Sequence, residues 1–206
     1  MIRPSSRRRA GIALSALAVM ATLVSGCSSD DKTRASAPPT PIARLNTAAM
    51  EIPRIDFCSR VPHQAVADAL DSRRSRLAAY GDGDRTAVAG ETDTVAENGC
   101  AWVSTTGPAM ARAWVFASPV DNALAHAAIR DARATTGCHL VKSPQFGSPT
   151  LTQVCENKGT TRVRHAGLFG TTWLTCEVSD TRKLANVRKR TNAWCVQIAN
   201  ALNTAR

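Results

Sequence analysis

Seven cysteines constrain this chain more than any other feature of its sequence. An odd number leaves at least one thiol outside any set of internal disulfides. The first, Cys27, directly follows the stretch Leu23-Val24-Ser25-Gly26, and the other six are spread over the rest of the chain. The fate of Cys27 therefore decides whether those six can pair among themselves.

The first 26 residues have the pattern of an export signal. A basic head contains Arg3, Arg7, Arg8 and Arg9, and an apolar run of 15 residues follows from Ala10 to Val24. A transmembrane helix needs roughly 20 apolar residues, whereas a run of this length after a basic head is typical of a secretory signal peptide. We predict a signal peptide over residues 1–26, for export by either the general or the twin-arginine route.

The end of this leader resembles the bacterial lipobox. The resemblance implies that the Cys27 thiol is alkylated by a diacylglycerol and that the signal peptide is cut just before it. An ordinary secretory signal followed by a chance cysteine is the alternative. Because two acyl chains hold a protein firmly on a bilayer, we expect a lipid anchor on the extracytoplasmic face of the cell membrane.

Once Cys27 is assigned to lipid, six cysteines remain, an even number that in an exported chain predicts three disulfides. Six cysteines allow 15 pairings, and the sequence does not choose among them. Our preferred hypothesis is sequential pairing. The absence of any C-x-x-C pair argues against a redox or metal role, so we expect neither a metal nor a cofactor. The hypothetical pairs are Cys58–Cys100, Cys138–Cys155 and Cys176–Cys195.

Composition divides the remaining chain into a tether and one domain. Residues 27–51 are polar and proline-rich, which predicts an extended tether, and residues 52–206 are enough for a single globular domain. The whole chain carries 26 basic and 16 acidic residues. Removing four arginines with the signal peptide leaves 22 − 16 = +6. This modest charge suits an anionic envelope surface, and we expect no nucleic-acid partner for an exported protein.

Hydrophobic periodicity predicts an α+β domain. Apolar spacing indicates helices over 59–71, 122–136 and 184–202, and two hairpins are expected over 99–117 and 160–178. Residues 138–155 look loop-rich, with a strand near 150–155, and one or two strands are expected within 73–97. The order of hairpins and helices favours an antiparallel sheet with helices packed on one face, held together by the three disulfides.

Five short motifs carry a resemblance to a known type of protein. The chain is similar to exported actinobacterial lipoproteins that carry a small cysteine-bearing domain of unknown function, over about residues 52–205 and the lipobox. The resemblance implies a cell-envelope location and no established activity, and it supplies no active site. The motifs are Cys58 before a short helix, Gly99-Cys100-Ala101-Trp102, Gly137-Cys138 with Phe146-Gly147 and Cys155, Trp173-Leu174-Thr175-Cys176, and Trp194-Cys195.

Two groups of side chains are candidates for binding. The first group is tryptophan, with Trp102 and Trp173 as the candidates among four. We expect the tryptophans mainly in the core. Trp173 lies opposite the aliphatic residues of its strand, so the alternative is that it lines a groove. Arg188, Lys189 and Arg190 lie on the last helix. A solvated helix face is the default interpretation, and contact with anionic headgroups or acidic wall polymers is the alternative.

Catalytic motifs are missing from the sequence. There is no G-x-S-x-G, H-E-x-x-H or P-loop pattern, and no S-x-x-K with its partner motifs. The four histidines are scattered, and we expect them at the surface or half-buried. We therefore predict a non-enzymatic binding or sensing role, with a small ligand, an envelope lipid or a protein as the partner. An envelope hydrolase or transferase with an unrecognised site, or a structural lipoprotein, is the alternative. A large closed pocket favours ligand binding, whereas a cleft that joins a serine or an acid to a histidine favours an enzyme.

Overall fold

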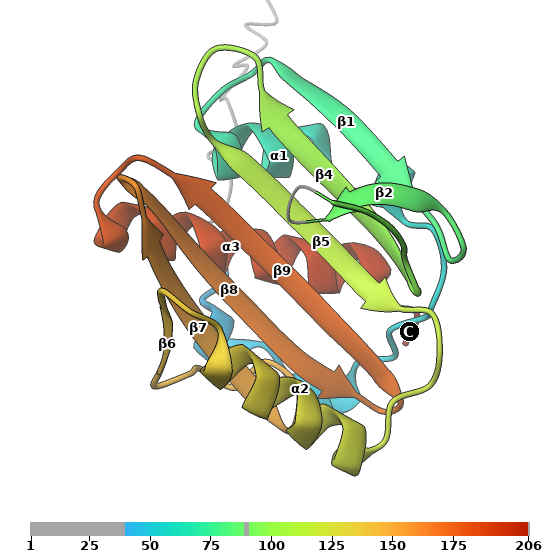
Figure 1. Cartoon of the computed structure of the whole chain (residues 1–206). Coiled ribbons are helices and arrows are strands. Elements are labelled where there is room, and N and C mark those ends of the chain that lie inside the picture. Colours follow the sequence, from blue (N-terminus) through green and yellow to red (C-terminus); the bar gives the residue numbers. More distant parts are fainter. Residues whose placement is uncertain (1–39, 89–90, 206) are drawn as a thin grey trace, which may run out of the picture. The chain divides into compact units, whose positions relative to one another are not determined.

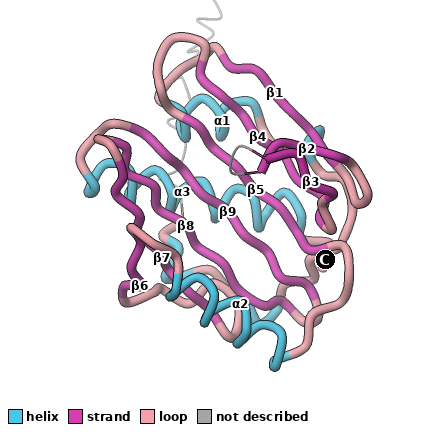
Figure 2. The backbone as a smooth tube through the Cα atoms, in the orientation of Figure 1, coloured by secondary structure: helices cyan, strands magenta, loops and turns pink. Residues whose placement is uncertain are grey.

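The computed structural model describes residues 40–88 and 91–205. The predicted signal peptide, Cys27 and the first half of the predicted tether lie outside these residues. Within them, seven antiparallel strands form one sheet in the order β1-β4-β5-β9-β8-β7-β6, and β2 and β3 form a separate hairpin (Figure 1). Neighbouring long strands are consecutive in sequence except at β5–β9 and β1–β4, so hairpin pairing builds most of the sheet (Figure 2).

The strands differ in length and burial. The two longest strands, β8 and the central β9, are paired in register from Thr161↔Asp180 to Phe169↔Thr172, and every residue of β9 is buried. The edge strand β1 is almost entirely exposed. The strands are β1 (Ser75–Tyr80), β2 (Arg85–Val88), β3 (Glu91–Thr94), β4 (Glu97–Ser104), β5 (Met110–Phe116), β6 (Cys138–Val141), β7 (Thr150–Asn157), β8 (Thr160–Phe169) and β9 (Thr172–Asp180).

Three α-helices cover the sheet: α1 (His63–Leu70), α2 (Asn122–Ala134) and α3 (Leu184–Leu202). Helices α1 and α3 lie behind the sheet in the view of Figure 1, whereas α2 lies in front of β7 and β8. The predicted α+β class is confirmed, and two helices share a face as expected. Helix α2 takes the opposite face, where Leu151 of β7, Ala166 and Leu168 of β8 and Trp173 of β9 form an apolar patch.

The two faces contain two separate apolar clusters. Side chains that alternate along β4, β5 and β9 form the larger one with α1 and α3, among them Cys100, Ala113, Cys176 and Trp194. The smaller cluster lies under α2 and includes Trp173, Ala125 and Leu151. Because strand residues point alternately to opposite faces, one sheet supplies both clusters. The helix-capping Asp121 fixes the start of α2 by accepting a hydrogen bond from Leu124 N at 2.8 Å.

The second half of the predicted tether packs against the domain. Residues 40–51 contain two short 3₁₀ helices, η1 (Ile42–Arg44) and η2 (Thr47–Ala49). Ile42 is buried in the larger core cluster, and Glu51 O accepts a hydrogen bond from Thr204 N at the opposite end of the chain. The proline-rich composition did not prevent packing, since Ile42 and Thr47 are buried and Leu45 and Met50 pack against the core. We call Thr40 to Ala43 the N-terminal strap.

The three disulfides join the pairs that the sequential hypothesis predicted. Cys58–Cys100 connects the third 3₁₀ helix, η3 (Cys58–Arg60), to β4, and Cys176–Cys195 connects β9 to α3, each with a Cα–Cα distance of 5.6 Å. Cys138–Cys155 joins directly opposed residues of β6 and β7, with a Cα–Cα distance of 4.1 Å. The segment 138–141 is therefore a strand, although the sequence favoured a loop there.

Candidate functional site

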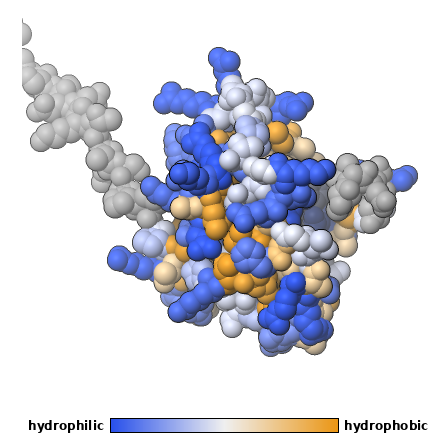
Figure 3. Space-filling view, turned by 60° about the vertical axis from the view of Figure 1, so that its left-hand side comes forward, coloured by the Kyte–Doolittle hydropathy of each residue, from blue (hydrophilic) through white to orange (hydrophobic). Residues whose placement is uncertain are grey.

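The most promising cavity lies between α3, the sheet and the N-terminal strap. Its volume is about 760 Å³, within the range of small-molecule sites. We call it the α3 pocket. Its walls combine apolar and cationic side chains, and Figure 3 shows one face of the molecule where hydrophobic residues are surrounded by hydrophilic ones. The lining residues are Thr40, Pro41, Ile42, Ala43, Lys142, Pro144, Thr152, His165, Leu184, Ala185, Arg188, Lys189, Asn192 and Ala193.

A buried histidine forms part of the floor of this pocket. His165 on β8 is directly opposite Thr152 on β7 in the sheet register, and its side chain is 1 % exposed. His165 Nδ1 lies 2.7 Å from Thr152 Oγ1, and His165 Nε2 lies 2.8 Å from Asn192 Oδ1 on α3. A second hydroxyl, Ser143 Oγ, lies 2.7 Å from Thr152 Oγ1. The expectation of surface or half-buried histidines is wrong for His165.

These contacts define the protonation of the imidazole. Because an amide oxygen only accepts, Nε2 carries the proton and donates to Asn192, and Nδ1 accepts from the Thr152 hydroxyl. Burial lowers the pKa of His165 from 6.5 to about 4, opposed by the Asn192 hydrogen bond and assisted by the nearby Arg188 charge. At neutral pH the floor of the pocket is therefore polar and uncharged.

Positive charge lines the walls of the α3 pocket. Arg188 and Lys189 come from α3, and Lys142 comes from the segment after β6. No aspartate or glutamate occurs among the described lining residues. The Nε of Arg188 is buried and has no hydrogen-bond partner within the described part of the chain. A buried donor without a partner costs free energy. The three cationic side chains without an acid among the described lining residues favour an anionic ligand group.

The basic residues predicted on the last helix have different environments. Arg188 and Lys189 both line the α3 pocket. Arg190 instead donates to Ala69 O at 3.0 Å and forms an ion pair with the buried Asp180. This contact joins α3 to α1 and β9, which is a structural role. Only two of the three predicted basic residues are therefore brought to the same cavity.

The tryptophans are core residues. Trp102 packs edge-to-face on Trp194, with ring centroids 5.2 Å apart, and Trp173 lies under α2 with 3 % exposure. The residues that sequence reasoning missed are His165, Thr152 and Asn192. The alternation in β8 carried a signal, since His165 shares the parity of Val163 and therefore the inner face of the strand.

A second concavity, of about 710 Å³, lies between α1 and α3. Its lining carries both signs of charge, with Asp68 and Asp71 near Arg182 and Lys189. Arg182 forms ion pairs with Asp71 and with Asp180. Because both signs of charge line this groove and Arg182 is already paired, it offers less to an anionic ligand than the α3 pocket does.

Comparison with known proteins adds little to this picture. No family model matches the chain, and no curated protein matches it in sequence. Among solved structures, a crystal structure described as a GTP binding regulator from Thermotoga maritima is similar over 71 % of this chain and 93 % of that one. The TM-score is 0.35 and the sequence identity is 9 %. No helix within residues 40–88 and 91–205 has the length and apolar character needed to cross a membrane.

Proposed function

We propose that this protein is a lipid-anchored binding protein of the cell envelope, whose α3 pocket holds a small amphiphilic molecule with an anionic group. The anchor is a diacylglycerol on Cys27, in line with the leader sequence. Three disulfides support export, because such bonds persist in oxidising compartments. The role is non-enzymatic: the ligand is bound and released, not converted.

One observation carries the choice of ligand. Three cationic side chains line the α3 pocket without a carboxylate among the described lining residues, and a donor of Arg188 has no partner. The apolar share of the lining, which includes Ile42, Pro144 and Leu184, suits a short hydrocarbon part. A neutral His165 accounts for the polar floor without adding charge.

The binding proposal can be tested with defined amphiphiles. The mature domain is titrated calorimetrically with lysophosphatidylglycerol, an anionic probe, and with lysophosphatidylcholine, a zwitterionic one. We expect saturable binding of the first and binding at least ten-fold weaker for the second. Arg188→Gln removes one charge-assisted contact of about 1.5–3 kcal/mol, which corresponds to roughly ten-fold or more in affinity. Arg133→Gln, on the exposed side of α2, is the control with the same change of charge. Equal binding of both probes, or equal loss in both variants, argues against the proposal.

The anchor is tested separately by mass spectrometry of the native protein. A diacylglycerol thioether on an N-terminal Cys27 is expected, and Cys27→Ser should abolish both the modification and membrane retention. A mature chain that begins elsewhere, without lipid, contradicts this part of the proposal but leaves the pocket untouched.

A hydrolase is the second candidate, because the floor of the α3 pocket joins a hydroxyl to a histidine. Thr152 Oγ1 donates to the neutral His165, whose other nitrogen is oriented by Asn192, an order of contacts found in hydroxyl nucleophile sites. Hydrolysis of a chromogenic short-chain ester that is lost in both Thr152→Val and His165→Gln, while binding of the anionic probe persists, would favour the enzyme.

A further inference from the structure

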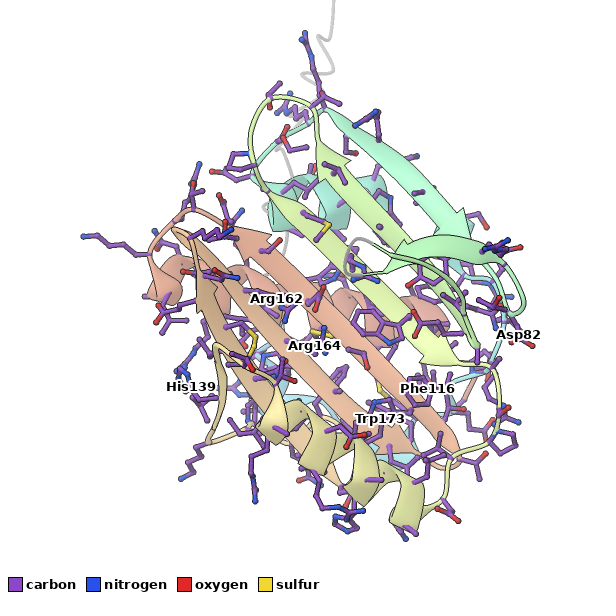
Figure 4. The ribbon with its side chains drawn as sticks, viewed as in Figure 1. Asp82, Phe116, His139, Arg162, Arg164 and Trp173 are labelled. Atoms are coloured by element: carbon purple, nitrogen blue, oxygen red, sulfur yellow. A yellow bond between two sulfur atoms is a disulfide. The ribbon has the colours of Figure 1, made fainter. Side chains whose placement is uncertain are left out.

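The sheet face opposite the α3 pocket carries a cluster of arginines around one buried carboxylate. Glu177 on β9 is 1 % exposed, and Arg164 Nε donates to its Oε2 at 2.8 Å. Arg112 Nη1 lies 3.5 Å from Oε1, and Arg162 Nε lies 3.8 Å from Oε2. Figure 4 shows Arg162 and Arg164 on the exposed side of the sheet, beside the region that α2 covers. We call these three guanidiniums the arginine cluster.

Positive charge exceeds negative charge in the arginine cluster. Three guanidiniums share the single carboxylate of Glu177, whose pKa they lower against the effect of burial. Among the acids whose side chains the structure describes, Glu97 also interacts with the cluster; it accepts a hydrogen bond from Tyr80 and has a raised pKa because it is buried. Even with Glu97 ionised, the described side chains leave one positive charge of the cluster uncompensated. The pKa of Arg162 is lowered, first by burial and then by the charges of Arg164 and Arg112.

One buried donor of the cluster has no hydrogen-bond acceptor among the described residues. Arg162 Nε is buried and makes no hydrogen bond in the described part of the chain, although Nη2 of the same group contacts Cys155 Sγ at 3.1 Å. The side chains of Arg162 and Arg164 are still 31 % and 23 % exposed. Both guanidiniums therefore have edges that reach solvent, next to each other on the same face of β8.

The floor beside these donors is aromatic. Trp114 is buried, and the guanidinium carbons of Arg112 and Arg164 lie 4.9 and 5.0 Å from its ring centroid. Arginine planes next to an aromatic ring are held with little freedom. The cluster is therefore pre-organised, which reduces the entropy lost when a ligand binds.

We propose that the arginine cluster is a binding site for a phosphate group. A guanidinium presents two parallel donors that match the oxygens of a phosphate, and a tetrahedral anion offers oxygens to Arg162 and Arg164 at once. Such an anion would neutralise the excess charge and satisfy open donors. The group comes either from a free phosphate monoester or inorganic phosphate, or from the phosphodiester of a lipid headgroup.

The test is a titration of the folded mature protein with inorganic phosphate at constant ionic strength, with sodium chloride as the replaced salt. Arginine Nε–H resonances are followed by nuclear magnetic resonance. We expect a saturable shift of the Arg162 and Arg164 signals. Glycerophosphoglycerol, a soluble headgroup phosphodiester, forms the second arm. Stronger binding of one probe identifies the source of the phosphate, and binding of neither overturns the proposal.

Two variants separate this site from a purely structural salt-bridge cluster and from the α3 pocket. Arg162→Gln, which removes the guanidinium with the longest contact to Glu177, should weaken phosphate binding at least ten-fold. Arg76→Gln, an exposed arginine on the edge strand β1, and Arg188→Gln in the α3 pocket should leave it unchanged. An unchanged affinity in Arg162→Gln with the fold intact refutes the assignment. If that variant does not fold, the same comparison is made with Arg162→Lys. This variant keeps the positive charge but loses the two parallel guanidinium donors, so it should still bind phosphate more weakly than the wild type.

Discussion

The buried His165 makes the stability of this protein depend on pH in a window where few other groups titrate. His165 is enclosed by β7, β8 and α3, and its two nitrogens are occupied by Thr152 and Asn192. Burial lowers its pKa to about 4 from 6.5. Acidification must therefore either charge the imidazole inside the fold or unfold the domain so that the imidazole can take up a proton.

The sign and size of this effect follow from proton linkage. Below pH 6.5 the unfolded chain binds a proton that the folded chain refuses, so the free energy of unfolding falls as the pH falls. The contribution is fully present above 6.5 and is lost progressively towards about 4, where the folded protein also binds the proton. A difference of about 2.5 pH units corresponds to about 3.4 kcal/mol in total. Between about pH 8 and pH 5 the expected loss is about 2 kcal/mol.

The measurement is urea unfolding followed by tryptophan fluorescence, with the disulfides intact, at pH values from about 8 to 5. The matched variant is His165→Gln, which cannot titrate in this range. We expect it to be less stable than the wild type at pH 8 by about 1–3 kcal/mol, since hydrogen bonds and packing are lost. Its stability should then change by about 2 kcal/mol less than that of the wild type on acidification.

The difference between the two curves isolates His165, because the carboxylates and the other histidines are common to both proteins. If both proteins lose the same stability between pH 8 and pH 5, His165 does not titrate as a buried neutral group, and the assigned tautomer has no support. A wild type that becomes more stable towards pH 5 relative to the variant would reverse the sign and refute the reasoning altogether.

Three further substitutions test other parts of the fold by the same unfolding assay. Glu177→Gln leaves three guanidiniums without their carboxylate and should lower the free energy of unfolding by about 2–3 kcal/mol. This is less than for a fully buried pair, because the arginines are partly exposed. A loss below about 0.5 kcal/mol would contradict the described cluster. Gly167→Ala places a Cβ against the carbonyl oxygen of Phe146, so a loss of about 3 kcal/mol or failure to fold is expected, whereas Gly107→Ala, whose nearest neighbour is Ser104 Oγ at 4.0 Å, should change little. Asp121→Ala removes the cap of α2 and should cost about 1 kcal/mol, while Asp121→Asn retains the acceptor and should cost less.

The elements with regular periodicity were predictable from the sequence. The stripe from Val187 to Leu202 predicted α3, and both ends of the stripe are buried in the structure. The alternation of Leu174, Cys176 and Val178 predicted the inner face of β9. The three disulfides also follow the sequential hypothesis, because each joins elements that are near neighbours in the fold.

The features that the sequence did not reveal depend mostly on contacts with elements that are distant in the chain. The alternation of β9 puts Trp173, Thr175 and Glu177 on the face opposite its aliphatic residues, and all three are nevertheless buried, with Trp173 under α2 and Glu177 among the three arginines. Strand β6 is only four residues long and owes its conformation to pairing with β7. In both cases the deciding partner lies far away in sequence, so local propensity has no information about it.

The two arginines of α3 illustrate why a basic run cannot be assigned a function from sequence alone. Arg188 and Arg190 belong to the same run of cationic residues, but helical geometry turns them to different sides. Arg190 meets a buried acid and a carbonyl that other elements provide, so its charge is used within the fold. Arg188 faces a cavity in which the described lining has no acid. The ratio of cations to carboxylates also separates Arg190, which pairs with Asp180, from the arginine cluster, where three guanidiniums share Glu177. Function on this domain is therefore to be sought where the fold supplies fewer carboxylates than cations, which is a property of the packed elements and not of any one segment.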